Sequence, residues 1–148
     1  MLTFDENFTR MKKIFKIALL CAALAGALAC FSSCSKDGIA INKLIGKWNA
    51  ETISVGGVTI DYEEIAGGGM FITFQRDGLY VAESTFQGQT QTESGTWEYS
   101  DDVLTTTING EESLYNVVEL KASEMVLSQE NDIDGKIVEV VLTLNKVK

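Results

Sequence analysis

The sequence predicts an all-β fold, an eight-stranded antiparallel up-and-down β-barrel that is preceded by an N-terminal signal segment. From residue 46 onward, short segments rich in Thr, Val, Ile and aromatic residues are separated by turn residues, a pattern typical of antiparallel strands. The 148 residues include no proline, which would remove hydrogen bonds from a strand ladder. A chain of this length fits one domain, and its 45% hydrophobic content argues against a disordered protein.

Eight strands are expected, and each is bounded by turn residues such as Gly, Asn, Asp or Ser. We place them at residues 46–55, 70–75, 79–86, 92–99, 103–108, 112–120, 124–130 and 136–146. A short extended piece at 58–62 can pair with the first strand, and 63–66 can form one helical turn. We expect the three glycines at 67–69 to be a flexible connection, since no basic residue accompanies them as in a phosphate-binding loop.

Residues 76–78 (RDG) predict a hairpin with a type I turn and a glycine in the left-handed bulge position. The register that follows places Phe74 opposite Tyr80 and Ile72 opposite Ala82 on one face of the sheet.

Residues 109–110 (NG) mark a second hairpin whose register stays open. A three-residue loop places Leu104 opposite Leu114, and a two-residue loop places it opposite Tyr115.

Eight strands linked by hairpins leave two unpaired edges, which closure into a barrel removes. A barrel of eight strands is wide enough to be filled by side chains or to hold one small ligand. The alternative architecture is a sandwich of two sheets.

The N-terminal segment has the order of a secretory signal. Lys12, Lys13 and Lys16 follow Met11, and an apolar run at 17–29 comes next. That run is shorter than the roughly 20 residues that span a membrane. We therefore predict a signal peptide at 1–33, with translation starting at Met11. The alternative is a short amphipathic tail.

Residues 31–34 (FSSC) resemble a bacterial lipobox, in which small residues precede a cysteine that becomes lipidated. We predict lipidation of Cys34, a tether with a short helical turn at 34–43, and a barrel domain at 44–148. The predicted location is the bacterial cell envelope, as an outer-membrane lipoprotein on the periplasmic face or the cell surface. The alternative is plain secretion with a free thiol.

Three segments resemble the Bacteroidetes lipocalin-like lipoproteins: residues 44–48 (LIGKW), 71–80 (FITFQRDGLY) and 95–99 (GTWEY). The resemblance implies an eight-stranded barrel that can hold a small apolar molecule, with Trp48 near its closed end. Lipocalins also stack an arginine on this tryptophan. The mature chain has a single arginine, which lies in a turn, and Lys146 is the candidate substitute.

Candidate ligand-binding residues are the apolar and aromatic side chains expected inside the barrel. They are Trp48, Ile72, Phe74, Tyr80, Trp97, Tyr99, Leu104 and Leu142, with Tyr115 as a further aromatic candidate. We expect no catalytic residue, metal site or cofactor, because the chain has no histidine to act as base or ligand. Residues 131–135 (NDIDG) lack the glutamate of a calcium loop at position twelve, so we expect an acidic hairpin turn.

The first functional hypothesis is binding of a small lipophilic molecule inside the barrel. The second is an acidic interaction module with a filled barrel, an inhibitor or accessory subunit that binds a basic protein. Its basis is the mature chain's net charge of −11, from eight basic and nineteen acidic residues. That charge argues against nucleic acid as a partner. An enzyme is the third and least supported hypothesis.

Overall fold

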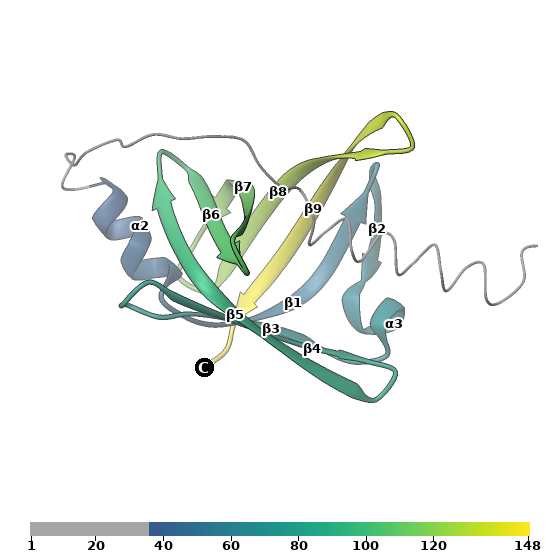
Figure 1. Ribbon diagram of the computed structural model, residues 1–148, viewed down its shortest axis with the longest axis horizontal. Coiled ribbons are helices and arrows are strands. Elements are labelled where there is room, and N and C mark those ends of the chain that lie inside the picture. The colour runs from purple at the N-terminus through teal and green to yellow at the C-terminus, as the bar shows by residue number, and fades with distance from the viewer. Residues whose placement is uncertain (1–35) are drawn as a thin grey trace, which may run out of the picture.

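The computed structural model describes residues 36–148, and they form a closed antiparallel barrel with two helices (Figure 1). The predicted signal peptide, the lipobox and Cys34 lie outside the described residues. The strands are β1 (Gly46–Val55), β2 (Val58–Asp61), β3 (Met70–Phe74), β4 (Leu79–Phe86), β5 (Gln89–Ser100), β6 (Val103–Ile108), β7 (Glu111–Leu120), β8 (Glu124–Ile133) and β9 (Lys136–Lys146). The helices are α2 (Lys36–Leu44) and α3 (Tyr62–Ala66).

Eight strands make the ring, since each of β3 to β8 pairs with the next strand in sequence and β1 pairs with both β3 and β9. The β1–β9 ladder removes both sheet edges, so the barrel prediction is confirmed over the sandwich. The ninth strand, β2, pairs with the second half of β1, as the extended piece at 58–62 predicted. The second half of β1 also pairs with β9, so β2 occupies the edge of β1 that β3 leaves free.

The strand pairing in the structure decides the register of the hairpins at 76–78 and 109–110. Phe74 pairs with Tyr80 and Ile72 with Ala82, as predicted from the turn at 76–78. Leu104 pairs with Tyr115, so the second hairpin has the two-residue loop. Asn109 and Gly110 both have positive φ, at 53° and 81°, which is the backbone that such a tight turn requires.

The two ends of the barrel differ, and α2 and α3 lie at opposite ends (Figure 1). The end that we call the α2 end carries α2, the hairpin turns before β4, β6 and β8, and the C-terminus. The end that we call the far end carries α3 and the turns before β2, β5, β7 and β9. Within 36–148 no helix is long and apolar enough to cross a membrane.

Four segments differ from expectation. β8 extends to Ile133 rather than ending at 130, because residues 131–133 pair with β9. The tether at 34–43 was expected to hold only a short helical turn, but α2 is a nine-residue helix whose Leu44 is buried. β5 begins at Gln89 rather than at 92, because the polar segment 89–91 pairs with β4 although no apolar alternation marks it. The glycines at 67–69 are packed rather than flexible: a Cβ on Gly68 would lie 2.7 Å from the Thr85 side chain.

Candidate functional site

The floor of the barrel is built around Trp48, whose side chain is fully buried at the α2 end. Its indole N–H donates a hydrogen bond of 2.8 Å to the carbonyl of Leu44, the last residue of α2. The ammonium of Lys146 lies 5.0 Å from the centre of the Trp48 ring and donates to the Lys43 carbonyl at 2.7 Å. Lys146 therefore takes the place on the tryptophan that the sequence assigned to it, and burial lowers its pKa.

A second aromatic cluster adjoins this floor. The Phe74 ring lies 5.3 Å from the Trp97 ring and 5.6 Å from the Tyr80 ring. The Trp97 indole N–H donates to the Gln75 carbonyl in the hairpin turn before β4 at 2.9 Å. Both tryptophans thus bury their rings while their single polar group is satisfied by a backbone carbonyl at the α2 end.

All eight predicted ligand-binding residues lie in one apolar cluster, but at different depths. Six are buried and pack the floor, namely Trp48, Ile72, Phe74, Tyr80, Trp97 and Leu104. Tyr99 is half-buried at the α2 end, and its hydroxyl donates to Asp102 at 2.8 Å. Leu142 is half-buried and is the one predicted residue on the wall nearer the far end.

On five strands the inner face of the barrel loses burial from the α2 end to the far end, whereas on β8 the inward Asn131, opposite Val138, stays buried. On β9 the inward row begins with Leu144, which is fully buried, and continues with Leu142, Val140 and Val138, which are half-buried. On β1, Trp48 and Ala50 are buried, whereas Ile53, opposite Leu142, is half-buried. The same change occurs on three other strands, from Ile72 to Met70, from Tyr80 to Ala82 and from Thr106 to Ile108. We call the half-buried set Ile53, Val55, Met70, Ala82, Ile108, Val138, Val140 and Leu142 the upper wall.

Polar side chains on the inner face were missed by the sequence reasoning. Thr106 and Ser113 are buried and pair across β6 and β7. Both hydrogen-bond the Tyr115 hydroxyl, although burial of this phenol is the larger effect and raises its pKa. Glu93 shares the inward row of Ala82, and its charge adds to the burial that raises the pKa of Tyr80. Counting alternate residues from Leu104 and Trp97 would have placed these groups inside, since strand neighbours at i and i+2 share a face.

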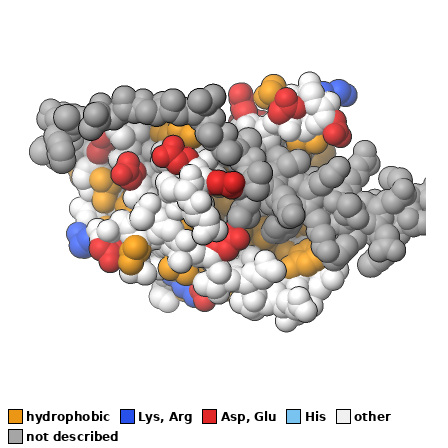
Figure 2. All heavy atoms as spheres, in the orientation of Figure 1, with side chains coloured by type: hydrophobic (Ala, Val, Ile, Leu, Met, Phe, Trp, Pro, Cys, Tyr) orange, Lys and Arg blue, Asp and Glu red, His pale blue; other side chains and the backbone are white. Residues whose placement is uncertain are grey.

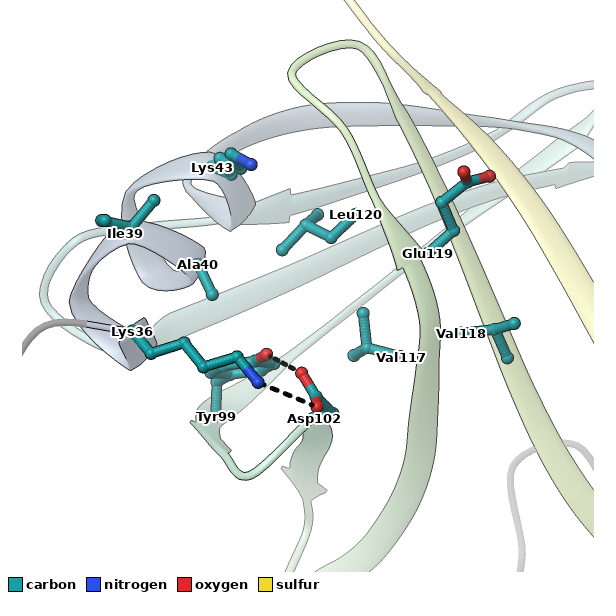
Figure 3. Close-up of a pocket in the computed structure, with 10 residues that line it drawn as sticks. All are labelled: Lys36, Ile39, Ala40, Lys43, Tyr99, Asp102, Val117, Val118, Glu119 and Leu120. Atoms are coloured by element: carbon teal, nitrogen blue, oxygen red, sulfur yellow. Dashed lines mark hydrogen bonds and ion pairs between the residues drawn. The ribbon is translucent and has the colours of Figure 1, made fainter. Parts of the chain in front are cut away.

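A groove of about 330 Å³ lies outside the barrel, between α2 and the end of β7 (Figure 3). Its apolar lining comes from Ile39 and Ala40 on α2 and from three residues near the end of β7, Val117, Val118 and Leu120. Lys36 extends along one side, with its ammonium 3.8 Å from the Asp102 carboxylate. Burial, with help from the hydrogen bond to Asp102, raises the pKa of Tyr99 to about 12.

The comparisons with known proteins agree with this geometry. Residues 44–127, more than half of the chain, match the Lipocalin-like domain family. The chain belongs to this family. The resemblance found in the sequence is thereby confirmed.

Solved structures share the lipocalin-like fold at low sequence identity. A lipocalin-like protein from Bacteroides uniformis matches with a TM-score of 0.54 and 15% identity over 71% of this chain and 99% of its own. An uncharacterized protein from Bacteroides eggerthii matches with a TM-score of 0.50 and 16% identity over 70% of this chain and 99% of its own. A redesigned β-barrel matches with a TM-score of 0.52 and 16% identity over 74% and 96%. A search of curated proteins finds no match.

The acidic turn expected at 131–135 is shorter than predicted, because residues 131–133 belong to β8 and pair with β9, and only Asp134 and Gly135 form the turn. Asp132 accepts a hydrogen bond of 2.7 Å from the Gly135 amide, so its carboxylate is used to close the β8–β9 hairpin. Among residues 36–148, no three acidic, cysteine or histidine side chains lie close enough together to hold a metal ion.

Proposed function

We propose that this lipocalin-like protein binds a small lipophilic molecule in the half of its barrel nearer the far end, while anchored to the bacterial envelope. The observation that carries the proposal is the loss of burial along the inner face. Packed side chains fill the floor, whereas the upper wall is apolar and keeps contact with solvent. Covering an apolar, solvent-accessible inner wall with a ligand is favourable, because it removes apolar surface from water.

The ligand would lie above the aromatic floor and against β1 and β9. Ile53, Leu142, Val55 and Val140 form two neighbouring cross-strand pairs there. The polar groups on the inner face of this half include the carboxylate of Glu93 and the side chain of Asn131, whose amide oxygen is buried without a hydrogen-bond partner among the described residues.

Adjacent residues of β9 offer a matched test of this site. Leu142 faces inward and Val141 faces outward, and both are half-buried. Titration with N-phenyl-1-naphthylamine, an apolar fluorescent probe, should show that Leu142→Trp weakens binding at least several-fold because the larger ring fills the upper half. Val141→Trp should bind as the wild type does. Thermal melts of both variants check that the fold is kept. Equal binding by the two variants, or no binding by the wild type, contradicts the proposal.

Native mass spectrometry of the protein purified from its own host identifies the ligand class. We expect a lipophilic molecule to co-purify with the wild type and to be depleted in Leu142→Trp. An empty wild-type barrel would count against the proposal.

The anchor is a separate part of the proposal, supported by the basic, apolar and small-residue order of the segment before Cys34. Cys34→Ala should abolish acylation and move the protein from the detergent phase to the aqueous phase in Triton X-114 partitioning. Cys30→Ala, within the predicted signal peptide, is the matched control and should leave partitioning unchanged. Detergent-phase partitioning of Cys34→Ala would refute the anchor. Protease treatment of intact cells then distinguishes the cell surface from the periplasmic face.

A second candidate function is binding of a basic protein, and the exposed carboxylates of the far end favour it. Glu111 and Glu112 stand there at the turn before β7. Glu111→Gln with Glu112→Gln should then slow association with such a partner, and added salt should slow it further in the wild type. Association that is indifferent to both changes would exclude this function.

A further inference from the structure

The cations of residues 36–148 are segregated along the barrel, whereas carboxylates occur at both ends. The α2 end carries those of Asp37, Asp77, Asp101, Asp102, Glu119 and Glu124, so its charges nearly cancel while the far end is strongly negative. Seven of the eight cationic side chains belong to the α2 end, namely Lys36, Lys43, Lys47, Arg76, Lys121, Lys146 and Lys148. The far end has Lys136 alone. It carries nine exposed carboxylates, those of Asp61, Glu63, Glu64, Glu111, Glu112, Glu130, Asp132, Asp134 and Glu139. On the face shown in Figure 2, acidic side chains are spread over both sides of the molecule and few basic side chains are visible.

The α2 end also exposes aliphatic side chains from four separate segments. Ile39 of α2 is 62% exposed and Val118 of β7 is 63% exposed, and both border the groove in Figure 3. Leu79 at the start of β4 and Val147 near the C-terminus are exposed as well.

Exposed aliphatic residues alone do not distinguish the two ends, because Ile137 at the far end is 67% exposed. Their surroundings do. Ile137 stands beside Asp132 and Asp134 of the β8–β9 hairpin, whereas Ile39 stands between Lys36 and Lys43 on α2, which has the single acidic residue Asp37. Aliphatic side chains among lysines fit a phospholipid surface with anionic headgroups, and a dense set of carboxylates is repelled by it.

The position of Cys34 agrees with this assignment. Two peptide units separate it from Lys36, the first residue of α2, and these span about 7 Å at full extension. Strands of about ten residues, tilted as in an eight-stranded barrel, place the far end roughly 25 Å farther away. An acyl chain on Cys34 therefore brings the α2 end, and not the far end, to the membrane.

We propose that the α2 end is a membrane-docking face, on which the barrel stands with its upper half and acidic rim directed away from the bilayer. The proposal rests on the lipid anchor of the proposed function and adds a defined orientation. The groove between α2 and β7 then faces the headgroups, with Lys36 and Lys43 beside its apolar lining.

The test uses the full-length lipidated protein in vesicles of phosphatidylethanolamine and phosphatidylglycerol. Ile39→Cys and Ile137→Cys are matched variants, since the two isoleucines are similarly exposed at opposite ends. Each variant is labelled with a fluorophore, and nitroxide-bearing phospholipids serve as quenchers. Quenching should be several-fold stronger for the label at 39 than for the label at 137.

A charge-reversed variant separates docking from simple tethering. Lys36→Glu with Lys43→Glu, added to Ile39→Cys, should reduce quenching toward that of the label at 137 while the protein stays on the vesicles. Vesicle-bound protein with equal quenching at 39 and 137, or unchanged quenching after charge reversal, overturns the docking face and leaves the anchor intact. Wild-type protein that fails to float with the vesicles overturns the anchor and, with it, the docking face.

Discussion

Gly95 of β5 offers the sharpest test of how the barrel is packed. It lies opposite Tyr80 of β4 and two residues before the buried Trp97. A Cβ at this position would lie 1.9 Å from the carbonyl oxygen of Thr107 and 2.9 Å from the carbonyl carbon of the same residue. Both atoms belong to the backbone of β6, so no side-chain rotation can relieve the overlap. Gly95→Ala must therefore move β5 away from β6.

The cost can be estimated from this geometry. Overpacking by added carbon atoms destabilises a core by about 1–3 kcal/mol, and the upper end applies because a backbone strand has to shift. The shift also loosens Trp97, whose pairing with Thr106 is the next rung of the ladder. We expect a loss of about 3 kcal/mol in the free energy of unfolding and a melting temperature lower by roughly 10 °C.

Urea denaturation followed by tryptophan fluorescence measures this loss, since both tryptophans are buried in the folded state. Gly38→Ala is the control. Gly38 lies in α2, and a Cβ there would meet no atom within 4 Å, so alanine should stabilise the helix by about 0.5–1 kcal/mol. If Gly95→Ala is within about 0.5 kcal/mol of the wild type, the close approach of β5 and β6 is wrong.

Two further predictions concern charge. Lys146→Met should change the free energy of unfolding at neutral pH by less than about 1 kcal/mol. The reason is that the cost of burying the ammonium, which lowers the pKa of Lys146, offsets its favourable contact with Trp48. A loss of about 3 kcal/mol in urea titrations would contradict this prediction. Since the folded pKa lies below the unfolded one, the wild type should gain stability relative to Lys146→Met as pH rises toward about 10.5. Burial raises the pKa of Tyr62 from 10.0 to about 12 and also raises those of Tyr80 and Tyr115, so the unfolded chain loses these protons first and stability should fall above about pH 10. Tyr62→Phe should reduce that fall in pH-dependent urea melts. An unchanged pH profile in that variant would refute the assignment.

The fold could be predicted because strand alternation and turn chemistry act locally. The three turn residues at 76–78 were enough to predict the register of their hairpin, and the structure has the same residue pairs. Residues 109–110 left two registers, since the choice between Leu114 and Tyr115 depends on which side chain reaches the barrel interior. The start of β5 escaped prediction because residues 89–91 are polar throughout and are held only by pairing with β4.

The site was less predictable than the fold. Apolar residues of the inner face were found, but strand alternation does not indicate depth in the barrel, so floor residues such as Phe74 and the upper-wall Leu142 looked alike. Depth depends on how α2 closes one end of the barrel. Because the sequence of this helix was interpreted as a tether, it did not indicate which end is closed. Glu93 and Thr106 were missed because the candidates were chosen for apolar character, although both residues share a strand face with the buried Trp97 and Leu104.

This division of the inner face makes stability and binding separable. The indole N–H groups of Trp48 and Trp97 are tied to carbonyls at the α2 end, and the aromatic rings fill the space between them, so the buried apolar area that stabilises the fold is concentrated there. The upper wall contributes less because it stays in contact with solvent. Substitutions of its inward residues should therefore alter ligand affinity more than the free energy of unfolding, whereas floor substitutions should do the reverse. A docking face at the α2 end places the rigid floor against the membrane and leaves the adaptable half facing away, where a ligand can enter without passing the lipid headgroups.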